Sequence, residues 1–200
     1  QFPQIMIGNA SPGPTIALPP TMGRYLKNVK RVVVSSTCAV YGNTSTFPTT
    51  ESVAKSPESP YALQKSCLED FCKLFGKLYG LDTVLLRYFN VFGRRQDPNG
   101  AYAAVIPKFV SQFINYESPI INGDGMFSRD FTYIDNVVQM NEKALLTENP
   151  NAVNTVYNTA YGDRTTLNDL INYLKEFLTE YDAKIADVEV IYGPNRPGDI

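Results

Sequence analysis

Two short segments of the chain carry the side chains best suited to acid–base chemistry. The segment Ser35–Thr37 follows the apolar run Val32–Val34, and this order predicts a buried strand with hydroxyl groups at its C-terminal end. Tyr61 and Lys65 are four residues apart, which places them one turn apart on the same face of a predicted helix. Because a nearby positive charge favours the phenolate, Tyr61 could act as a base toward an alcohol, with Thr37 sharing the proton.

The elements around these segments predict an α/β fold with a parallel sheet, because strands and helices alternate along the chain. Pro60 favours the start of the helix that carries Tyr61 and Lys65, and Gly80 favours its end. We expect helices over 60–79, 103–115, 134–146 and 167–178, the last with Thr166 as its N-cap. We expect strands over 31–36, 83–87, 120–121, 127–132, 156–159 and 188–191.

The composition excludes several classes of site. The chain has 18 basic and 20 acidic residues without a block of like charge, unlike a nucleic-acid-binding surface, and its apolar runs are too short to span a membrane. It contains no histidine, which excludes Ser-His-Asp and Cys-His catalysis within the chain and most catalytic zinc sites. Cys38, Cys67 and Cys72 lack the spacing of a disulfide framework, and we interpret them as reduced thiols of a cytoplasmic protein.

Two more segments, Arg87–Asn90 and Ser128–Phe131, follow the first two along the chain. In their order and spacing, the residues from about Val29 onward resemble the extended short-chain dehydrogenases/reductases, and among them the nucleotide-sugar epimerases and dehydratases. The segments 99–108 and 162–168 are most similar to bacterial UDP-N-acetylglucosamine 4-epimerases, which supply UDP-N-acetylgalactosamine for surface polysaccharides.

The resemblance implies a Rossmann-like parallel sheet that binds NAD and a small C-terminal α/β region that binds substrate. It assigns 29–115 to the C-terminal part of the NAD-binding domain, and 116–200 mostly to the sugar-nucleotide-binding region, with elements that return to the core. Residues 1–28 do not align with the family, and their prolines predict irregular or extended structure. Since a Rossmann domain begins with a Gly-rich turn and no G-x-G-x-x-G occurs, we expect the N-terminal half of the enzyme to be missing and the 200-residue chain to be inactive alone.

By this resemblance Tyr61 is the acid/base, Thr37 bonds the reacting hydroxyl, and Lys65 supports the phenolate. Cofactor contacts are assigned to Ser35, Ser36, Tyr61, Lys65 and Tyr88. The two serines have an alternative role, the satisfaction of backbone groups.

Residues assigned to the UDP-sugar are Thr37, Asn90, Ala104, Asn122, Arg129, Arg196 and Asp199. Arg129 and Arg196 correspond to two arginines that clamp the diphosphate, a task that suits a guanidinium fork. Asn90 corresponds to an asparagine that binds the diphosphate or the sugar. Asp199 corresponds to a carboxylate that accepts the uridine ribose hydroxyls, and Asn122 is expected beside the uracil.

The two residues after Thr37 indicate the reaction. Family dehydratases carry Asp and Glu at the positions of Cys38 and Ala39, and the UDP-glucuronate decarboxylases carry Glu at the position of Ala39. Neither Cys38 nor Ala39 can usefully transfer that proton, which favours NAD-dependent 4-epimerisation through a 4-keto intermediate. UDP-GlcNAc and UDP-GalNAc are the preferred substrates and UDP-Glc and UDP-Gal the next; a UDP-uronate 4-epimerase and a non-catalytic fragment remain as alternatives.

The helix over 60–79 carries apolar residues on two faces. The main stripe consists of Leu63, Cys67, Phe71, Leu74, Phe75 and Leu78, and the second face of Ala62, Leu68 and Cys72. Two apolar faces are expected where such a helix is buried on both sides, and family members commonly dimerise through it. We therefore expect a homodimer with a UDP-sugar as its ligand, and no metal, nucleic-acid or membrane partner.

Overall fold

The structure, a computed structural model, describes residues 5–7, 29–99 and 104–195. The chain forms two compact units, one from Gln1–Phe89 with Asp135–Ala160 and one from Asn90–Ile134 with Tyr161–Ile200. Of 1–28, which we expected to be irregular or extended, only Ile5–Ile7 are described, and they form strand β1.

The first unit is built on a parallel sheet, as predicted. Its strands lie in the order β1, β2 (Arg31–Thr37), β3 (Asp82–Tyr88) and β8 (Thr155–Thr159). Neighbouring strands are parallel throughout, and their register aligns Thr37, Tyr88 and Thr159 across three strand ends. The hydroxyl-bearing end of β2 therefore lies at the carboxyl edge of the sheet, where parallel sheets collect ligand-binding groups.

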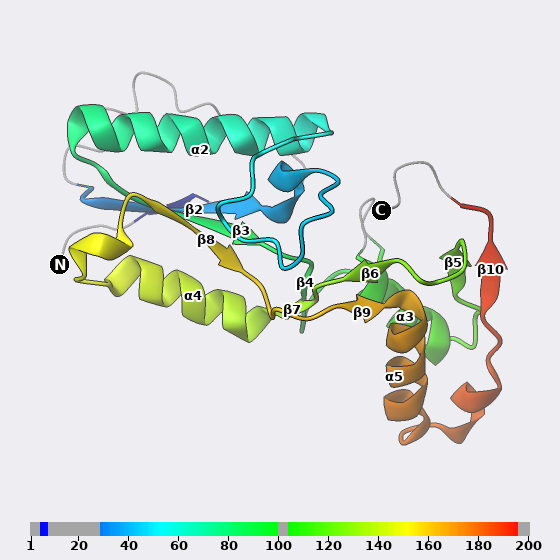
Figure 1. The fold of residues 1–200 in the computed structure, drawn as a ribbon. Coiled ribbons are helices and arrows are strands. Elements are labelled where there is room, and N and C mark those ends of the chain that lie inside the picture. Colours follow the sequence, from blue (N-terminus) through cyan, green and yellow to red (C-terminus); the bar gives the residue numbers. More distant parts are fainter. Residues whose placement is uncertain (1–4, 8–28, 100–103, 196–200) are drawn as a thin grey trace. The chain divides into compact units, whose positions relative to one another are not determined.

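Helices α2 (Pro60–Tyr79) and α4 (Ile134–Leu146) cover opposite faces of this sheet (Figure 1). Successive side chains of a strand point to opposite faces, so the β2 valines divide between the two helices. Val32 and Val34 pack on the side of Leu68 and Cys72, whereas Val33 packs on the side of Met140 and Ala144. A short 3-10 helix, η2 (Pro150–Ala152), connects α4 to β8.

Local signals set the bounds of α2. The Ser59 side chain accepts a hydrogen bond from the Ala62 amide, Pro60 occupies the first turn, and Gly80 ends the helix with a φ of 65°. These are favourable cap residues, because glycine adopts a positive φ without a Cβ penalty. Both predicted ends are confirmed.

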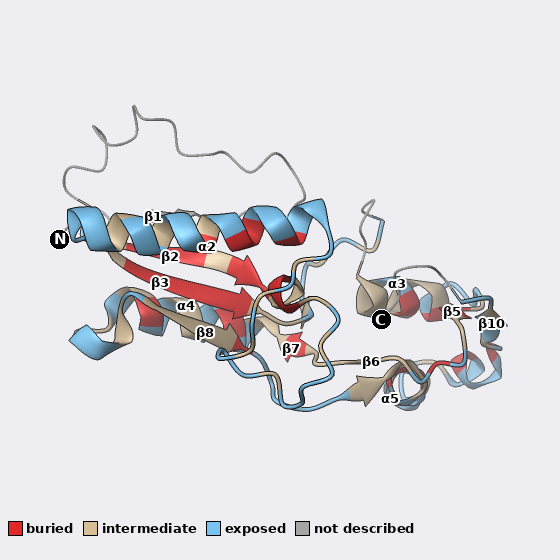
Figure 2. Cartoon of the chain, turned by 45° about the horizontal axis from the view of Figure 1, so that its top comes forward, coloured by how far each residue is buried: buried red, intermediate tan, exposed pale blue. Residues whose placement is uncertain are grey.

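The two apolar faces of α2 differ in burial. Ala62 is buried, and Leu68 and Cys72 pack on the sheet, whereas most of the main stripe is exposed on the chain by itself (Figure 2). The exposed members are Leu63, Cys67, Phe71, Leu74 and Leu78. The face named as second in the sequence is thus the one that packs on the core of this unit.

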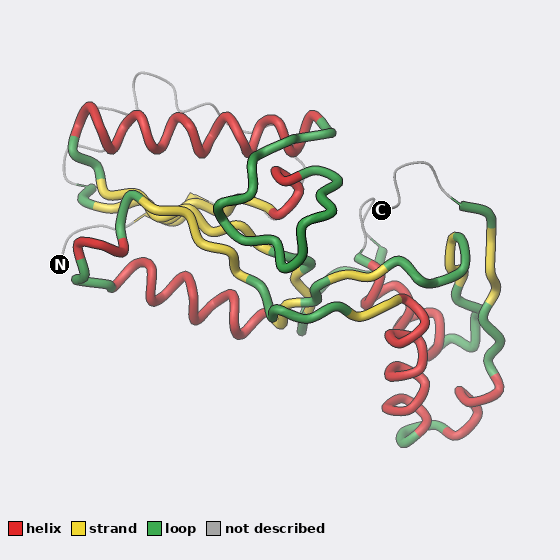
Figure 3. Tube along the Cα trace, viewed as in Figure 1, coloured by secondary structure: helices red, strands yellow, loops and turns green. Residues whose placement is uncertain are grey.

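The segment between β2 and α2 is mostly loop after the 3-10 helix η1 (Cys38–Tyr41) (Figure 3). Gly42 follows η1 with a φ of 65°, and a Cβ there would lie 2.0 Å from the Ser56 carbonyl oxygen. Glycine is required at this position, since both the backbone angle and the close approach exclude a side chain. The turn brings the Ser56 amide to the Val40 carbonyl, at 2.9 Å.

Over its described residues, the second unit combines short strands with two α-helices. The strand pairs are β4 (Val91–Phe92) with β7 (Thr132–Tyr133), β5 (Ile120–Asn122) with β10 (Ile191–Gly193), and β6 (Ser128–Arg129) with β9 (Thr165–Thr166). The helices are α3 (Val105–Ile114) and α5 (Leu167–Thr179). They share a core whose buried members are Phe109, Phe113, Ile121, Leu170, Ile171, Ile185 and Val188.

Three expectations differ from this unit. The single strand predicted over 127–132 is two strands, β6 and β7, which pair with β9 and β4 respectively. The strand predicted over 188–191 begins at Ile191, because the 3-10 helix η3 (Ala183–Asp187) delivers Val188 into the core instead. The expected boundary at 115/116 also shifts. Helix α3 packs with α5 in the second unit, while the later segment 135–160 returns to the sheet of the first.

Candidate active site

The catalytic residues named from the sequence come together in the first unit. Thr37 ends β2 and is 9% exposed, and its side-chain oxygen accepts a hydrogen bond from the Ala39 amide at 3.2 Å. Tyr61, in the first turn of α2, forms a side-chain hydrogen bond with Thr37 and remains 42% exposed. The phenol therefore lies beside the threonine hydroxyl and is accessible to a ligand.

Lys65 lies one helical turn after Tyr61 and approaches it as predicted. Its Nζ is 5.8 Å from the centre of the Tyr61 ring and donates a 2.8 Å hydrogen bond to the Ser35 carbonyl. Lysine has three N–H donors, so this bond occupies one of them. The Nζ is thereby held at the end of β2, within reach of the Tyr61 ring.

Burial shifts the pKa values of both side chains toward their neutral forms. Burial lowers the pKa of Lys65. It also raises the pKa of Tyr61, against the hydrogen bond with Thr37, which lowers it, and the neighbouring Cys38 adds to the rise. A phenolate at Tyr61 thus needs further positive charge nearby.

Ser35 and Tyr88, assigned to the cofactor by resemblance, bond to each other. The Ser35 hydroxyl donates to the Tyr88 oxygen at 3.1 Å, and the Tyr88 hydroxyl donates to Asn141 of α4 at 2.9 Å. This chain of hydrogen bonds links the ends of β2 and β3 to α4. Contact of Ser35 and Tyr88 with a cofactor stays a prediction.

Ser36 belongs to a buried network that the sequence analysis missed. Its hydroxyl donates to Glu69 of α2, which also receives two hydrogen bonds from Arg87 of β3. Burial alone would raise the pKa of Glu69, but the bonds from Arg87 and Ser36 and the charges of Arg87 and Lys55 outweigh it and hold the pKa below its usual range. The spacing of Glu69, four residues after Lys65, was the available signal.

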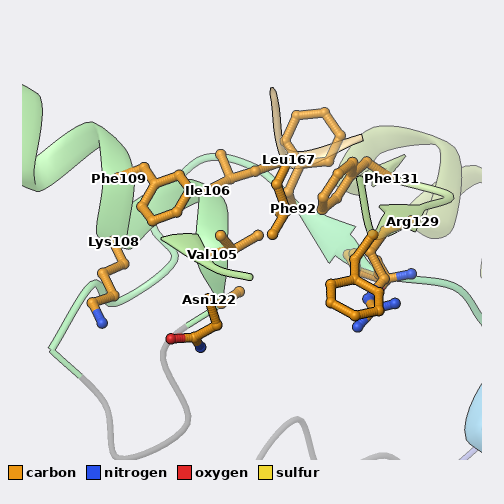
Figure 4. A pocket seen from close by; sticks show the side chains of 13 residues that line it. Phe92, Val105, Ile106, Lys108, Phe109, Asn122, Arg129, Phe131 and Leu167 are labelled. Atoms are coloured by element: carbon orange, nitrogen blue, oxygen red, sulfur yellow. The ribbon is translucent and has the colours of Figure 1, made fainter. Parts of the chain in front are cut away.

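The second unit holds a cavity of about 350 Å³ (Figure 4). Four residues assigned to the substrate line it: Asn90, Ala104, Asn122 and Arg129. Most of the remaining wall is apolar, formed by Val91, Phe92, Val105, Ile106, Phe109, Phe127, Phe131 and Leu167. An apolar cavity with a few polar groups is the usual form of a small-molecule site.

The polar groups of the cavity favour an anionic ligand. Arg129 comes from β6, and Lys108, which the sequence analysis did not name, comes from α3. No carboxylate lies among the lining residues that the structure describes. Two cations in a lining without carboxylates would attract phosphate oxygens.

Asn90 is held in place from one side. Its side-chain amide donates to the Asp130 carbonyl oxygen at 3.1 Å, and the Asp130 carboxylate accepts from the Tyr161 and Gly162 amides at 2.9 and 2.8 Å. These bonds join the segments that follow Phe89 and Ala160. The predicted residues Arg196 and Asp199 lie outside the described part of the chain.

Over the described ranges, no cluster of three or more His, Cys, Asp or Glu side chains is arranged to hold a metal ion. Within the same ranges, no helix is both long and apolar enough to cross a membrane.

Residues 18–160 match the model of the NAD dependent epimerase/dehydratase family. A putative UDP-glucose 4-epimerase of Methanocaldococcus jannaschii is 38% identical over 171 residues, covering 86% of this chain and 52% of that protein. The chain thus spans about half the length of this relative.

Solved structures agree. The UDP-N-acetylglucosamine 4-epimerase of Methanobrevibacter ruminantium, in complex with UDP-N-acetylmuramic acid, superposes with a TM-score of 0.79 at 43% identity, over 90% of this chain and 55% of that one. The UDP-glucose 4-epimerase of Thermotoga maritima, with UDP-glucose, superposes with a TM-score of 0.77 at 40% identity, over 86% of this chain and 53% of that one. The expected α/β, Rossmann-like fold is confirmed, and the chain belongs to the NAD dependent epimerase/dehydratase family.

Proposed function

We propose that the protein containing this chain is an NAD-dependent 4-epimerase of UDP-sugars. The observation that carries the proposal is the meeting of Tyr61, Thr37 and Lys65 at the carboxyl edge of the parallel sheet. The similar proteins named as UDP-glucose and UDP-N-acetylglucosamine 4-epimerases support it. UDP-GlcNAc and UDP-GalNAc are the preferred substrates in the proposal, and UDP-Glc and UDP-Gal the next.

In this proposal Tyr61 takes the proton of the substrate's 4-hydroxyl and later returns it. Thr37, which already bonds to Tyr61, orients the same hydroxyl. Lys65 lowers the cost of the phenolate through its positive charge. General acid–base catalysis of this kind contributes about 10²–10⁴-fold to a rate.

The residues of the first unit fit NAD in their donor chemistry. The Lys65 ammonium carries N–H donors beyond the one it gives to the Ser35 carbonyl, and these suit the hydroxyls of a ribose. When bound, NAD would accept the hydride from carbon 4 and give it back. The charge of its oxidised ring would add to that of Lys65 in favouring the Tyr61 phenolate.

The cavity of the second unit would hold the sugar nucleotide. Arg129 and Lys108 suit the diphosphate, and Asn90 and Asn122 offer both donors and acceptors to the sugar and the uracil. Arg196 and Asp199 are proposed to complete the site. The first unit thus carries the cofactor and the chemistry, and the second carries recognition.

Epimerisation is favoured over elimination by the residues that follow Thr37. Cys38 and Ala39 open η1, where the Ala39 amide caps on Thr37. An alanine has no proton to transfer, and a thiol lacks the acidity of the carboxyl group that expels water. Nothing in this turn replaces the acid that loss of water or of carbon dioxide requires.

A UDP-uronate 4-epimerase is the second candidate, and Lys108 favours it. A sugar carboxylate would need a cation of its own, and in this candidate Lys108 would serve the carboxylate while Arg129 alone serves the diphosphate. The UDP-glucuronic acid 4-epimerase of Bacillus cereus is similar in structure, with a TM-score of 0.72 at 28% identity.

We also propose that the protein is a cytoplasmic homodimer that pairs through α2, and that its product serves surface polysaccharide synthesis. The exposed stripe of α2, which includes Phe71 and Leu74, supports the pairing, since a contiguous exposed apolar patch marks an interaction surface. Leu74→Asp should yield a monomer by light scattering. Phe177→Asp, at an exposed position on α5, should not change the oligomeric state.

The activity is tested in three reactions, each of which contains the full-length protein, NAD and one UDP-sugar: UDP-GlcNAc, UDP-Glc or UDP-glucuronate. The products of each reaction are then resolved. We expect the C4 epimer, formed fastest from UDP-GlcNAc. Fastest turnover of UDP-glucuronate would select the second candidate. Release of water or carbon dioxide as the main reaction would refute 4-epimerisation.

A further inference from the structure

The first unit contains a buried ion pair that no step above uses. The side chains of Glu69 and Arg87 are 0% and 3% exposed. Arg87 donates through Nε to Oε1 of Glu69 at 2.9 Å and through Nη2 to Oε2 at 2.7 Å. This two-point geometry fixes both side chains more tightly than a single contact would.

Glu69 lies on the same face of α2 as the proposed catalytic residues Tyr61 and Lys65. Tyr61, Lys65 and Glu69 are spaced four residues apart on α2, so they share one face over successive turns. Each turn meets the end of β2: Tyr61 bonds to Thr37, Lys65 to the Ser35 carbonyl, and Glu69 to the Ser36 hydroxyl.

Glu69 also reaches β3, because its partner Arg87 is the register neighbour of Ser36. One carboxylate therefore ties α2 to two strands at once. From Arg87 the contacts continue to Tyr41 of η1, whose ring lies 4.7 Å from the guanidinium carbon, and from Tyr41 to Asn158 of β8 through a 2.6 Å hydrogen bond.

A buried ion pair adds little stability compared with apolar residues of similar volume, because desolvation offsets the attraction between its charges. Its directional bonds nevertheless favour one arrangement of the elements over others. Here the elements so joined are the ones that carry Thr37, Tyr61 and Lys65.

We propose that Glu69 and Arg87 are positioning residues for the acid–base pair: they set the rotation and height of α2 on β2 and β3, which keeps Lys65 beside the Tyr61 ring. This inference rests on the proposed function, because it gives the ion pair a part in preparing Tyr61. The Nζ of Lys65 lies 5.8 Å from the centre of the Tyr61 ring, and burial together with the charge of Cys38 raises the pKa of Tyr61. Arg87 and Lys55 are the cations that face Glu69, and burial together with the charge of Glu69 raises the pKa of the half-buried Cys72 thiol.

The test is the double variant Glu69→Met/Arg87→Met in the full-length protein, which leaves the net charge unchanged and keeps the site filled. Three quantities are measured: the urea midpoint of unfolding, kcat and KM for UDP-GlcNAc, and the pKa of Tyr61. The last is read by NMR on protein with ¹³C-labelled tyrosine, the Tyr61 signal being assigned by its loss in Tyr61→Phe. Asp70→Asn, the neighbouring but exposed carboxylate, is the matched control.

We expect the double variant to unfold near the wild-type midpoint, with a higher Tyr61 pKa than the wild type as Lys65 moves away. Its kcat should fall about 10-fold with KM nearly unchanged, because only the catalytic geometry is lost. Asp70→Asn should match the wild type in all three. A folded double variant with wild-type kcat and Tyr61 pKa would overturn the proposal.

Two further variants keep the test decisive. If the double variant does not fold, Glu69→Asp replaces it, because this substitution keeps the charge and shortens the side chain. Glu69→Asp should raise the Tyr61 pKa and lower kcat by less than the changes expected for the double variant. Wild-type values of both quantities would overturn the proposal. Glu69→Gln distinguishes a positioning role from a direct effect of the Glu69 charge. Loss of a negative charge that acts through space would lower the Tyr61 pKa, whereas loss of positioning would raise it. Inactivity of the wild type toward UDP-sugars would refute the proposed function, whereas the Tyr61 titration requires no turnover.

Discussion

The two units hold their functional side chains in different ways. In the first, the residues at the carboxyl edge of the sheet are tied to one another by hydrogen bonds, as Ser35 is to Tyr88 and Lys65 to the Ser35 carbonyl. In the second, an apolar cavity presents a few polar groups, and Lys108 reaches it from an exposed position on α3. Under the proposed function, the comparison suggests a rule: chemistry needs fixed geometry, whereas recognition of a large anionic ligand tolerates longer and looser side chains.

The largest expected effect is on the chemistry of the first unit. Tyr61→Phe should lower kcat by about 10²–10⁴-fold, because we propose that its hydroxyl is the acid/base in the transition state. The affinity for the UDP-sugar, measured calorimetrically, should change little. Tyr79→Phe, at the exposed end of the same helix, is the control. Near wild-type turnover of Tyr61→Phe would remove Tyr61 from the mechanism.

Next in size is the stability of the first unit. Arg87→Met leaves Glu69 charged and buried with Lys55, 3.8 Å away, as its remaining cation, and should lower the free energy of unfolding by about 3–5 kcal/mol. Urea unfolding at neutral pH measures this loss. An unfolding free energy within about 1 kcal/mol of the wild type would mean that solvent reaches Glu69, against its burial in the structure.

Arg87→Met should also reverse the direction in which acidification changes the stability of the protein. In the wild type the pKa of Glu69 is held low, so its stabilisation is complete at neutral pH and is lost as pH falls below about 4. In Arg87→Met burial raises the pKa of Glu69, so acidification from neutral pH should relieve part of the instability. Unfolding curves recorded between pH 7 and pH 4 compare the two slopes.

Recognition by the second unit should respond differently. Arg129→Met should raise KM for the UDP-sugar by about 10- to 100-fold, the worth of hydrogen bonds to a charged group, with a much smaller change in kcat. Lys175→Met, on α5 and outside the set of residues that line the cavity, is the matched control. A loss confined to kcat would place Arg129 in the chemistry and break the division between the units.

The smallest effects come from two matched helix caps. Ser59 caps α2 in the first unit, and Thr166 caps α5 in the second through a reciprocal pair of bonds with Asp169. Ser59→Ala and Thr166→Ala should each cost about 1 kcal/mol of stability. Thermal unfolding followed by circular dichroism measures both. A cost near zero for either would show that the helix end is held by packing alone.

The sequence was most informative where a local signal sets the structure. Pro60 and Gly80 bound α2 correctly, and Thr166 caps α5, because caps depend only on neighbouring backbone groups. The strands β4 and β7 had no such signal, since each has two residues and exists only by pairing across the fold. The strand predicted at Val188 was wrong for a related reason: this apolar side chain packs in the core directly after the 3-10 helix η3, and not as part of a strand.

The candidate site divides along the same line. Tyr61, Lys65 and Thr37 could be named because helical spacing and strand ends are visible in the sequence. The partnership of Glu69 with Arg87 could not, because a charged residue in a helix is usually solvated and only tertiary packing buries it. Lys108 likewise reads as a surface lysine until α3 brings it to the cavity.

The most direct test of the account is the fate of the hydrogen at carbon 4. UDP-GlcNAc deuterated at C4 is incubated with the full-length protein and NAD in ordinary water, and the product is examined by NMR and mass spectrometry. Removal and return of a hydride predicts UDP-GalNAc that retains deuterium at C4, with no water or carbon dioxide released. Loss of the deuterium to solvent, or its migration to another carbon with elimination of water, would contradict 4-epimerisation by this protein.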